Sequence, residues 1–283
     1  MLTVNLFDSN FPGQSCSVFG QTSERIAYVR NHMTWDGITV FTDGQMFGPA
    51  VDAVQSPIKV GWLHEGKALH PENYERAWEV RHQFDEIWTY DQQLLDADPE
   101  KFKLTLRGGT WLPQRTWGIP VKTTHAAMIL SDKEQLPGHA LRHAIANSAL
   151  DELALYGPSY TPIGVAKELA YGTAQYAVVV EASREDNFFS EHLLDALAMG
   201  CVVFYWGCPN IGRYLDDQVI IPFATISELR WLLTTNGTPE YRRHLSALAR
   251  IQRHLPVYCI TEDWQATYRY PALVSRLMRT VPA

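Results

Sequence analysis

Glu181 and the polar residues after it are the first candidates for chemistry in this sequence. Glu181 closes the apolar run YAVVVE at 176–181, and Ser190 and Glu191 open the next segment with helical spacing. Ser190 is the expected N-cap, and an acid in the first turn suits the helix dipole. A strand end and the helix start that follows it lie at the ligand edge of a parallel sheet. We therefore expect free N–H groups near 190–193 to bind an anion.

The next apolar run, VVFYW at 202–206, ends in the same way. Gly207, Pro209 and Asn210 follow it closely, so a third polar segment is expected at the same sheet edge. A capping serine and a first-turn acid also occur in helices that bind nothing. The convergence of three successive elements favours a binding site over that simpler interpretation.

The elements that must position these residues alternate along the chain. Expected strands cover 2–7, 38–42, 58–63, 86–90, 101–106, 125–130, 153–156, 175–181, 201–206 and 219–223. Expected helices cover 72–84, 138–150, 161–171, 190–199, 225–235, 238–254 and 261–279. Strands that alternate with helices predict an α/β protein built on parallel sheets.

The segment 107–124 is the expected domain boundary, because it combines glycines and prolines with no clear periodicity. It predicts a first domain over 1–115 and a second over 116–283, which suits a chain of 283 residues. The fold class we expect is α/β, with two Rossmann-like domains facing across a cleft. The C-terminal helix at 261–279 is a candidate to pack back on the first domain.

Composition excludes several classes of protein. Hydrophobic residues make up 46% of the chain and charged residues 19%, as in folded globular proteins, so disorder is not expected. A net charge of −7 without a basic stripe argues against a nucleic-acid partner. No run approaches about 20 apolar residues, so no membrane span is expected. The opening MLTVNLFDSN shows no signal-peptide pattern, and we expect a cytoplasmic protein.

No metal site is expected from the sequence. Asp96 and Asp98 form an Asp-x-Asp motif, but it lies in a short helical stretch before Pro99 rather than after a buried strand. The cysteines match no zinc or redox spacing and are expected to be buried thiols in a reducing compartment. They are Cys16, Cys201, Cys208 and Cys259.

Three stretches resemble the family 10 α1,3/4-fucosyltransferases. VVVEASREDNFFSEHLLDALAMGCVVFYWGCPNI resembles the family's donor-binding region, where a strand ends in an acid and a Ser/Thr-Glu pair opens a helix. An Asp-Ala pair and a strand before an aromatic-Gly-x-Pro segment follow in the same order. The other stretches are ILSDKEQLPGHALRHAIANSALDELALYGP and SPIKVGWLHEGKALHPENYERAWEVRHQFDEIWTYD. The resemblance implies a GT-B fold and an inverting transferase that uses GDP-fucose, with no cofactor.

The resemblance also implies roles for individual residues. Arg142 corresponds to the arginine that reaches the donor diphosphate, and a planar guanidinium suits phosphate oxygens. Glu191 would bind the ribose hydroxyls, and Glu181 would lie near the sugar or orient the loop. Glu65 falls on the proposed general base, which takes a proton from the acceptor hydroxyl. Lys167 is interpreted as structural or peripheral. The implied partners are a nucleotide sugar and a glycan acceptor.

Three positions depart from the family pattern. His192 stands where the family has a helix-opening lysine that binds phosphate. Ala182 replaces the asparagine that follows the strand-end acid, and Phe188 replaces a tyrosine. His192 can donate to a phosphate, but it is a poorer fixed charge than an ammonium group. Two alternatives therefore stay open: a GT-B transferase with another donor, such as a UDP-sugar, and a non-catalytic nucleotide-sugar or glycan-binding protein. His64, which replaces a glycine of the family beside Glu65, is a second candidate for the base.

Overall fold

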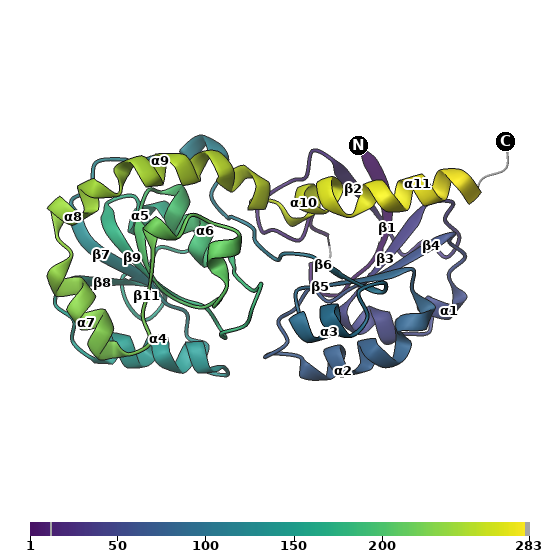
Figure 1. Cartoon of the computed structure of the whole chain (residues 1–283), viewed down its shortest axis with the longest axis horizontal. Coiled ribbons are helices and arrows are strands. Elements are labelled where there is room, and N and C mark those ends of the chain that lie inside the picture. The colour runs from purple at the N-terminus through teal and green to yellow at the C-terminus, as the bar shows by residue number, and fades with distance from the viewer. Residues whose placement is uncertain (12, 281–283) are drawn as a thin grey trace. The chain divides into compact units, whose positions relative to one another are not determined.

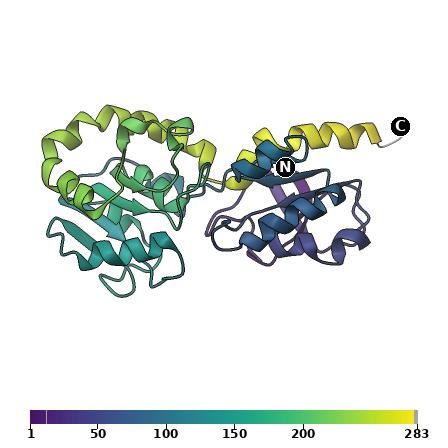
Figure 2. The same ribbon diagram turned by 60° about the horizontal axis from the view of Figure 1, so that its bottom comes forward.

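The chain folds into two compact units. The computed structural model describes residues 1–11 and 13–280. The first unit is Met1–Arg107 with Ile260–Ala283, and the second is Gly108–Cys259. Each contains a parallel sheet with helices on both faces (Figures 1 and 2), so the predicted α/β class with two sheet domains is confirmed. None of the helices in this described part is both long and apolar enough to cross a membrane.

The first unit is built on a sheet with the strand order β2-β1-β3-β4-β5-β6, in which each neighbouring pair is parallel. Its strands are β1 (Leu2–Phe7), β2 (Ile26–Arg30), β3 (Ile38–Thr42), β4 (Ile58–Trp62), β5 (Glu86–Thr89) and β6 (Phe102–Leu104). β2 pairs with one edge of β1, and the chain then returns so that β3 pairs with the other edge of β1. Ligand crevices form outside the carboxyl ends of strands at such a reversal point.

The second unit follows the same plan, with the parallel order β11-β10-β9-β7-β8. Its strands are β7 (Thr124–Ile129), β8 (Leu153–Tyr156), β9 (Ala174–Val180), β10 (Val202–Trp206) and β11 (Ile220–Pro222). β9 is buried along its whole length, as expected for a central strand covered on both faces. Here the chain reverses direction between β7 and β9.

Local sequence explains where several helices begin. The Thr225 hydroxyl accepts a hydrogen bond from the Glu228 N–H at 3.1 Å, and the Glu228 carboxylate accepts one from the Thr225 N–H at 3.3 Å. This capping box starts α7, and Pro137 occupies the first turn of α4, where its fixed φ is favourable. The helices of the second unit are α4 (Pro137–Asn147), α5 (Glu168–Tyr171), α6 (Glu191–Ala198), α7 (Ile226–Thr235), α8 (Thr238–Arg243) and α9 (Leu245–His254).

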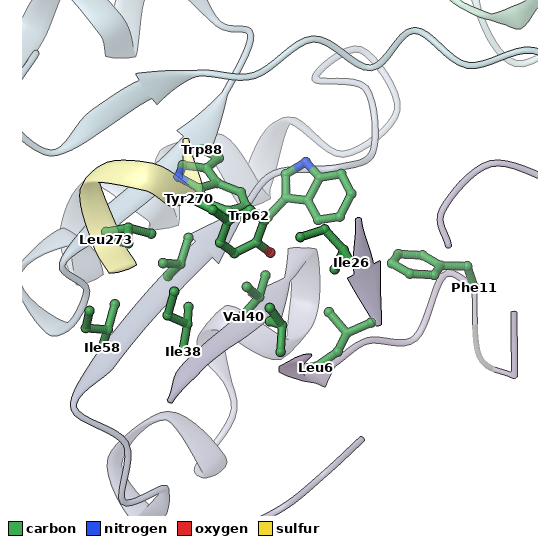
Figure 3. Packing of buried hydrophobic residues seen from close by; sticks show 12 residues of the cluster. Leu6, Phe11, Ile26, Ile38, Val40, Ile58, Trp62, Trp88, Tyr270 and Leu273 are labelled. Atoms are coloured by element: carbon green, nitrogen blue, oxygen red, sulfur yellow. The ribbon is translucent and has the colours of Figure 1, made fainter. Parts of the chain in front are cut away.

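The C-terminal helices complete the core of the first unit. The helices of this unit are α1 (Ala50–Ala53), α2 (Pro71–Val80), α3 (Gln92–Ala97), α10 (Thr261–Tyr268) and α11 (Tyr270–Thr280). Tyr270 and Leu273 of α11 are buried in one cluster with Trp62 and Trp88 (Figure 3). The rings of Trp88 and Tyr270 meet edge to face, 5.0 Å apart. The last helix is therefore part of this core and not an appendage to it.

The structure differs from the expected elements at several places. The helix expected over 261–279 is divided at Arg269 into α10 and α11. β2 was not predicted, because it is short and only its first residue is fully buried. The helix expected over 238–254 is broken at His244, which ends α8 and precedes α9. The helix expected over 161–171 is reduced to α5, and Gly164, with φ of +55°, interrupts the segment before it. The unit boundary at Arg107 lies at the start of the glycine- and proline-rich segment 107–124.

Candidate functional site

The reversal point of the second sheet gathers the residues expected to bind a donor. Arg142 comes from α4, which follows β7, and Glu181 comes directly after β9. Ser190 lies at the N-cap of α6, and Glu191 and His192 are its first two residues. Glu181 and Glu191 are near enough to Arg142 for their charges to act on its pKa. These five predicted site residues of the second unit are therefore brought together.

Glu181 holds the beginning of α6 in place. Its carboxylate accepts hydrogen bonds from the Ser190 N–H at 3.1 Å and from the Ser190 hydroxyl at 2.6 Å. The Tyr205 hydroxyl donates to the same carboxylate at 3.3 Å. Glu181 is 1% exposed, and burial raises the pKa of its carboxyl group. Of the two roles that the resemblance implied, this geometry matches the one of orienting the loop.

Two glycines permit this close packing around Glu181. A Cβ atom on Gly138 of α4 would stand 1.8 Å from the Glu181 carbonyl oxygen, and one on Gly207 would stand 2.5 Å from the Glu181 Cγ. The Gly138 N–H donates to the Ala182 carbonyl at 2.9 Å. α4 therefore approaches the end of β9 at a distance that no other residue type at position 138 allows.

The first turn of α6 uses its own N–H groups. The Ser190 hydroxyl accepts a hydrogen bond from the His192 N–H at 3.3 Å, and the Ser190 carbonyl accepts one from the Leu193 N–H at 3.2 Å. Because the Ser190 N–H itself donates to Glu181, the expectation of free N–H groups across 190–193 was wrong for Ser190, His192 and Leu193. This turn still offers an anion the positive end of the helix dipole and the side chains around it.

Arg142 is a buried cation that forms no ion pair with a carboxylate of the described residues. It is 5% exposed, and its Nε and Nη2 atoms both donate to the Val180 carbonyl, the former at 2.8 Å. No carboxylate in the described part of the chain forms an ion pair with it. Burial lowers its pKa, but a guanidinium stays charged at neutral pH. The charges of Glu181 and Glu191 act on it without forming an ion pair, so an external anion in direct contact would further stabilise this buried charge.

Lys167 and Asp195 form a buried ion pair behind Glu191. The Lys167 Nζ lies 2.7 Å from the Asp195 carboxylate and 3.7 Å from that of Glu191. The Thr110 hydroxyl and the Trp111 N–H also donate to Asp195, at 2.5 and 3.0 Å. Lys167 is therefore structural, and it is buried and not peripheral. The sequence alone does not indicate this role of Asp195, because its partners at 110, 111 and 167 are distant in the chain.

His192 is uncharged at neutral pH in this site. Burial lowers its pKa to about 3, the Glu191 carboxylate at 3.5 Å opposes that shift, and the charges of Lys167 and Arg142 add to it. The side chain remains 25% exposed, so it is accessible to a ligand. It therefore offers a ligand hydrogen bonds without a fixed charge.

In the first unit, Glu65 and His64 follow β4 at the carboxyl end of the sheet. The Glu65 carboxylate lies 3.7 Å from the His64 Nδ1 and 3.7 Å from the Arg107 Nη1, distances of ion pairs and not of hydrogen bonds. His64 contributes most to lowering the pKa of Glu65 to about 2, and Arg107 adds to that effect while burial opposes it. Glu65 is therefore a carboxylate at ordinary pH, with reduced basicity.

Asp43 fixes the backbone of this pair, a role that sequence analysis missed. Its Oδ1 accepts hydrogen bonds from the N–H groups of both His64 and Glu65, and Asn10 donates to its other oxygen. Asp43 is 3% exposed and follows β3 directly, at the carboxyl edge of the sheet. The available signal was an acid just after a buried strand, in the loop FTDGQMFG.

The described residues include no group of three or more His, Cys, Asp or Glu side chains that could hold a metal ion. Asp96 accepts a hydrogen bond from Gln92 at 2.7 Å, and Asp98 pairs with Arg81 at 3.4 Å, so these two acids are engaged separately. All four cysteines are buried, and none is in a disulfide.

Comparison with known proteins gives a likeness in structure only. No family model and no curated protein matches the chain. An α1,3-fucosyltransferase with GDP aligns over 99% of this chain and 91% of its own, with a TM-score of 0.60 and 12% identity. An α1,3-fucosyltransferase with GDP-fucose aligns over 100% of this chain and 91% of its own, with a TM-score of 0.57 and 12% identity. An α-glucosyltransferase in complex with UDP-glucose and DNA containing an abasic site aligns over 85% of this chain and 80% of its own. The TM-score is 0.52 and the identity 9%. The chain therefore has the GT-B fold of these glycosyltransferases.

Proposed function

We propose that this protein is an inverting glycosyltransferase that takes a sugar from a nucleoside-diphosphate donor. The observation that carries the proposal is Arg142, a buried guanidinium with no described carboxylate partner at the reversal point of the second sheet. A diphosphate supplies the missing negative charge, and the remaining N–H groups of the guanidinium suit phosphate oxygens. Glu191, a partly exposed carboxylate at the start of α6, is suited to accept hydrogen bonds from ribose hydroxyls.

The acceptor side of the proposal rests on Glu65. Glu65 takes the proton of the acceptor hydroxyl while that oxygen forms a bond to the anomeric carbon of the donor. The bond from this carbon to the diphosphate oxygen breaks, the nucleoside diphosphate leaves with the electron pair, and the anomeric centre is inverted. A positioned base contributes about 10²–10⁴-fold to the rate. Stabilisation of the leaving diphosphate by Arg142 adds to this.

GDP-fucose is the donor that we propose first. The sequence resemblance over 178–211 and the structural likeness to an α1,3-fucosyltransferase with GDP-fucose support the same donor. His192 is neutral, so Arg142 carries most of the positive charge that a diphosphate would meet. A UDP-sugar remains the alternative donor for this fold, as in the α-glucosyltransferase complex.

A second candidate, a non-catalytic nucleotide-sugar-binding protein, is favoured by one observation. His64 and Arg107 lower the pKa of Glu65 to about 2, which weakens it as a base at neutral pH. If Glu65 is not the base, His64 beside it is the alternative. Nucleotide binding without sugar transfer by the wild type would favour this second candidate.

Thermal unfolding with GDP, UDP, ADP and CMP, each at millimolar concentration, tests the donor site. A ligand at 100 times its Kd stabilises the folded state by about 2.7 kcal/mol, which raises the Tm visibly. We expect GDP to raise the Tm of the wild type. Arg142→Gln should weaken GDP binding by about 1.5–3 kcal/mol, the scale of a charge-assisted hydrogen bond. Arg253→Gln, at an exposed arginine of α9, is the matched control and should change nothing. No shift with any nucleotide would contradict the proposal.

A further inference from the structure

The second unit contains a pocket whose lining includes none of the residues proposed above to bind the donor. It has a volume of about 570 Å³ and lies at the carboxyl ends of β10 and β11. Its lining comes from residues 205–213, from the β11 region and from Arg184. Pockets for small ligands have volumes of about 300–1,000 Å³, so this one is large enough for a sugar ring with a substituent.

The lining combines an apolar surface with two arginines. Trp206, Ile220 and Phe223 supply the apolar part. The Arg184 guanidinium carbon lies 5.8 Å from the centre of the Trp206 ring, and Arg213 ends the short helical turn that begins at Ile211. The pocket therefore offers both aromatic surface and planar cationic groups.

In the described part of the chain, neither arginine is in an ion pair. Within residues 1–11 and 13–280, no carboxylate forms an ion pair with Arg184 or Arg213, although both side chains are exposed. Asp186 is the acid whose charge acts on Cys208 and Tyr214 at this pocket, and it pairs with neither arginine. Two unpaired arginines at one pocket of a chain with net charge −7 favour an anionic ligand.

One wall of the pocket is held rigidly before any ligand arrives. The Asn210 amide donates to the Asn187 side chain at 2.8 Å and accepts a hydrogen bond from the Asn187 N–H at 2.8 Å. The Tyr214 hydroxyl donates to the same Asn187 oxygen at 2.5 Å. The Cys208 N–H is bonded to the Tyr205 hydroxyl, which in turn donates to Glu181. The pocket wall is thereby linked to the residue that orients the start of α6.

We propose that this pocket binds a sugar ring that carries one anionic group, a carboxylate or a phosphate. The apolar surface around Trp206 packs against the ring, and Arg184 and Arg213 bind the anion through charge-assisted hydrogen bonds. Such an anionic sugar has two sources in glycosyl transfer: an acidic residue of the acceptor, or the sugar-phosphate part of the donor. Binding to the pocket does not require the transfer reaction, so it can be tested by itself.

Glucuronate and glucose are the probes. They have the same ring substituents except that glucuronate carries a carboxylate in place of the hydroxymethyl group of glucose. Binding is followed by NMR through the indole N–H signal of Trp206, which Trp206→Phe assigns. We expect glucuronate to bind at least about 5-fold more tightly than glucose, and Arg184→Gln or Arg213→Gln to weaken it about 5–20-fold at low salt. Arg253→Gln should leave the affinity unchanged. Equal affinities for the two sugars, or unchanged affinity in both pocket variants, would overturn the proposal.

Adding an intact nucleotide sugar, GDP-fucose, distinguishes the two sources. If the donor's sugar-phosphate part occupies the pocket, intact GDP-fucose displaces glucuronate. If an acidic acceptor occupies it, glucuronate binds equally well with and without saturating GDP-fucose. Both results keep the pocket assignment. Glucuronate binding that depends on Arg213 in a protein that binds no nucleotide would contradict the proposed function while leaving the pocket assignment intact.

Discussion

The Asp43 carboxylate accepts a hydrogen bond from the backbone N–H of Glu65 at 3.0 Å. The same oxygen binds the His64 N–H at 2.9 Å, so one buried acid fixes both residues that are candidates for the base. Asp43 has a φ of +43°, which is in the left-handed region that aspartate and asparagine tolerate better than most residues. The position of the proposed base therefore depends on a side chain that directly follows the neighbouring strand β3.

Substitution of Asp43 separates this positioning from backbone strain. Asp43→Asn keeps an acceptor oxygen and tolerates the positive φ, so turnover should stay within about 5-fold of the wild type. Asp43→Gly accepts the φ but removes the oxygen, and we expect kcat to fall roughly 10²-fold with KM for the donor unchanged. Steady-state kinetics of both variants provide the measurement. Equal activity of Asp43→Gly and the wild type would remove the positioning role.

Glu65→Gln should abolish most turnover and also change how stability depends on pH. The folded-state pKa of Glu65 is about 2, below the ordinary 4.5, so its charged form stabilises the folded state above pH 4.5. That contribution is lost as the pH falls from about 4.5 to about 2. We therefore expect the wild type to be more stable than Glu65→Gln at pH 7, with the difference shrinking through that window. Urea unfolding of both proteins at several pH values measures it.

The kinetic control for Glu65→Gln is donor binding. GDP affinity should be unchanged, because Glu65 belongs to the acceptor side of the proposal. Turnover reduced by at least about 10²-fold is expected for loss of a general base. Retained turnover would direct attention to His64, and His64→Gln would then be the informative variant.

His192→Lys restores a fixed positive charge at the start of α6. The native ring is neutral at pH 7, and a lysine ammonium would interact with a bound diphosphate beside Arg142. We expect GDP affinity to rise about 2–5-fold at low salt, the scale of a partly exposed charge interaction, and the gain to shrink as salt is added. His254→Lys, at an exposed residue that ends α9, provides the control. A marked loss of GDP affinity in His192→Lys would mean that the imidazole binds something that an ammonium cannot.

Gly138→Ala tests the close approach of α4 to the end of β9. The added Cβ would meet the Glu181 carbonyl oxygen at 1.8 Å, so either the helix or the strand end must move. We expect a loss of about 1–3 kcal/mol in the free energy of unfolding, despite the better helix propensity of alanine. In the control, Gly237→Ala, the nearest atom to the added Cβ lies 3.6 Å away, and little change is expected. Equal stabilities of the two variants would show that this approach is not tight in solution.

The sequence predicted the strands whose apolar runs are uninterrupted. β9 and β10 are buried on both faces, and their runs of valine and aromatic residues are visible without any tertiary information. β2 differs, since Ile26–Arg30 is short, lies at the sheet edge and is only partly buried after its first residue. Its strand conformation depends on pairing with β1, which no local pattern reveals.

In the candidate site, too, some features have a local sequence signature and others depend on contacts between distant residues. Ser190 and Glu181 were identified because an N-cap and a strand-end acid have local signatures. The contact between them, and the burial of Lys167 against Asp195, join residues from separate elements and required the fold. The pKa values of His192 and Glu65 likewise depend on neighbours that the sequence alone does not bring together.

The two units differ in when their chains become complete during synthesis. The second unit is one continuous segment, Gly108–Cys259, whereas the core of the first includes Tyr270 and Leu273 beside Trp62 and Trp88. Once residue 259 has left the ribosome during synthesis, every residue of the second unit is available for folding. The first unit still lacks α11, the helix that covers its core. Translation thus imposes an order in which the unit that begins first is the last to be finished.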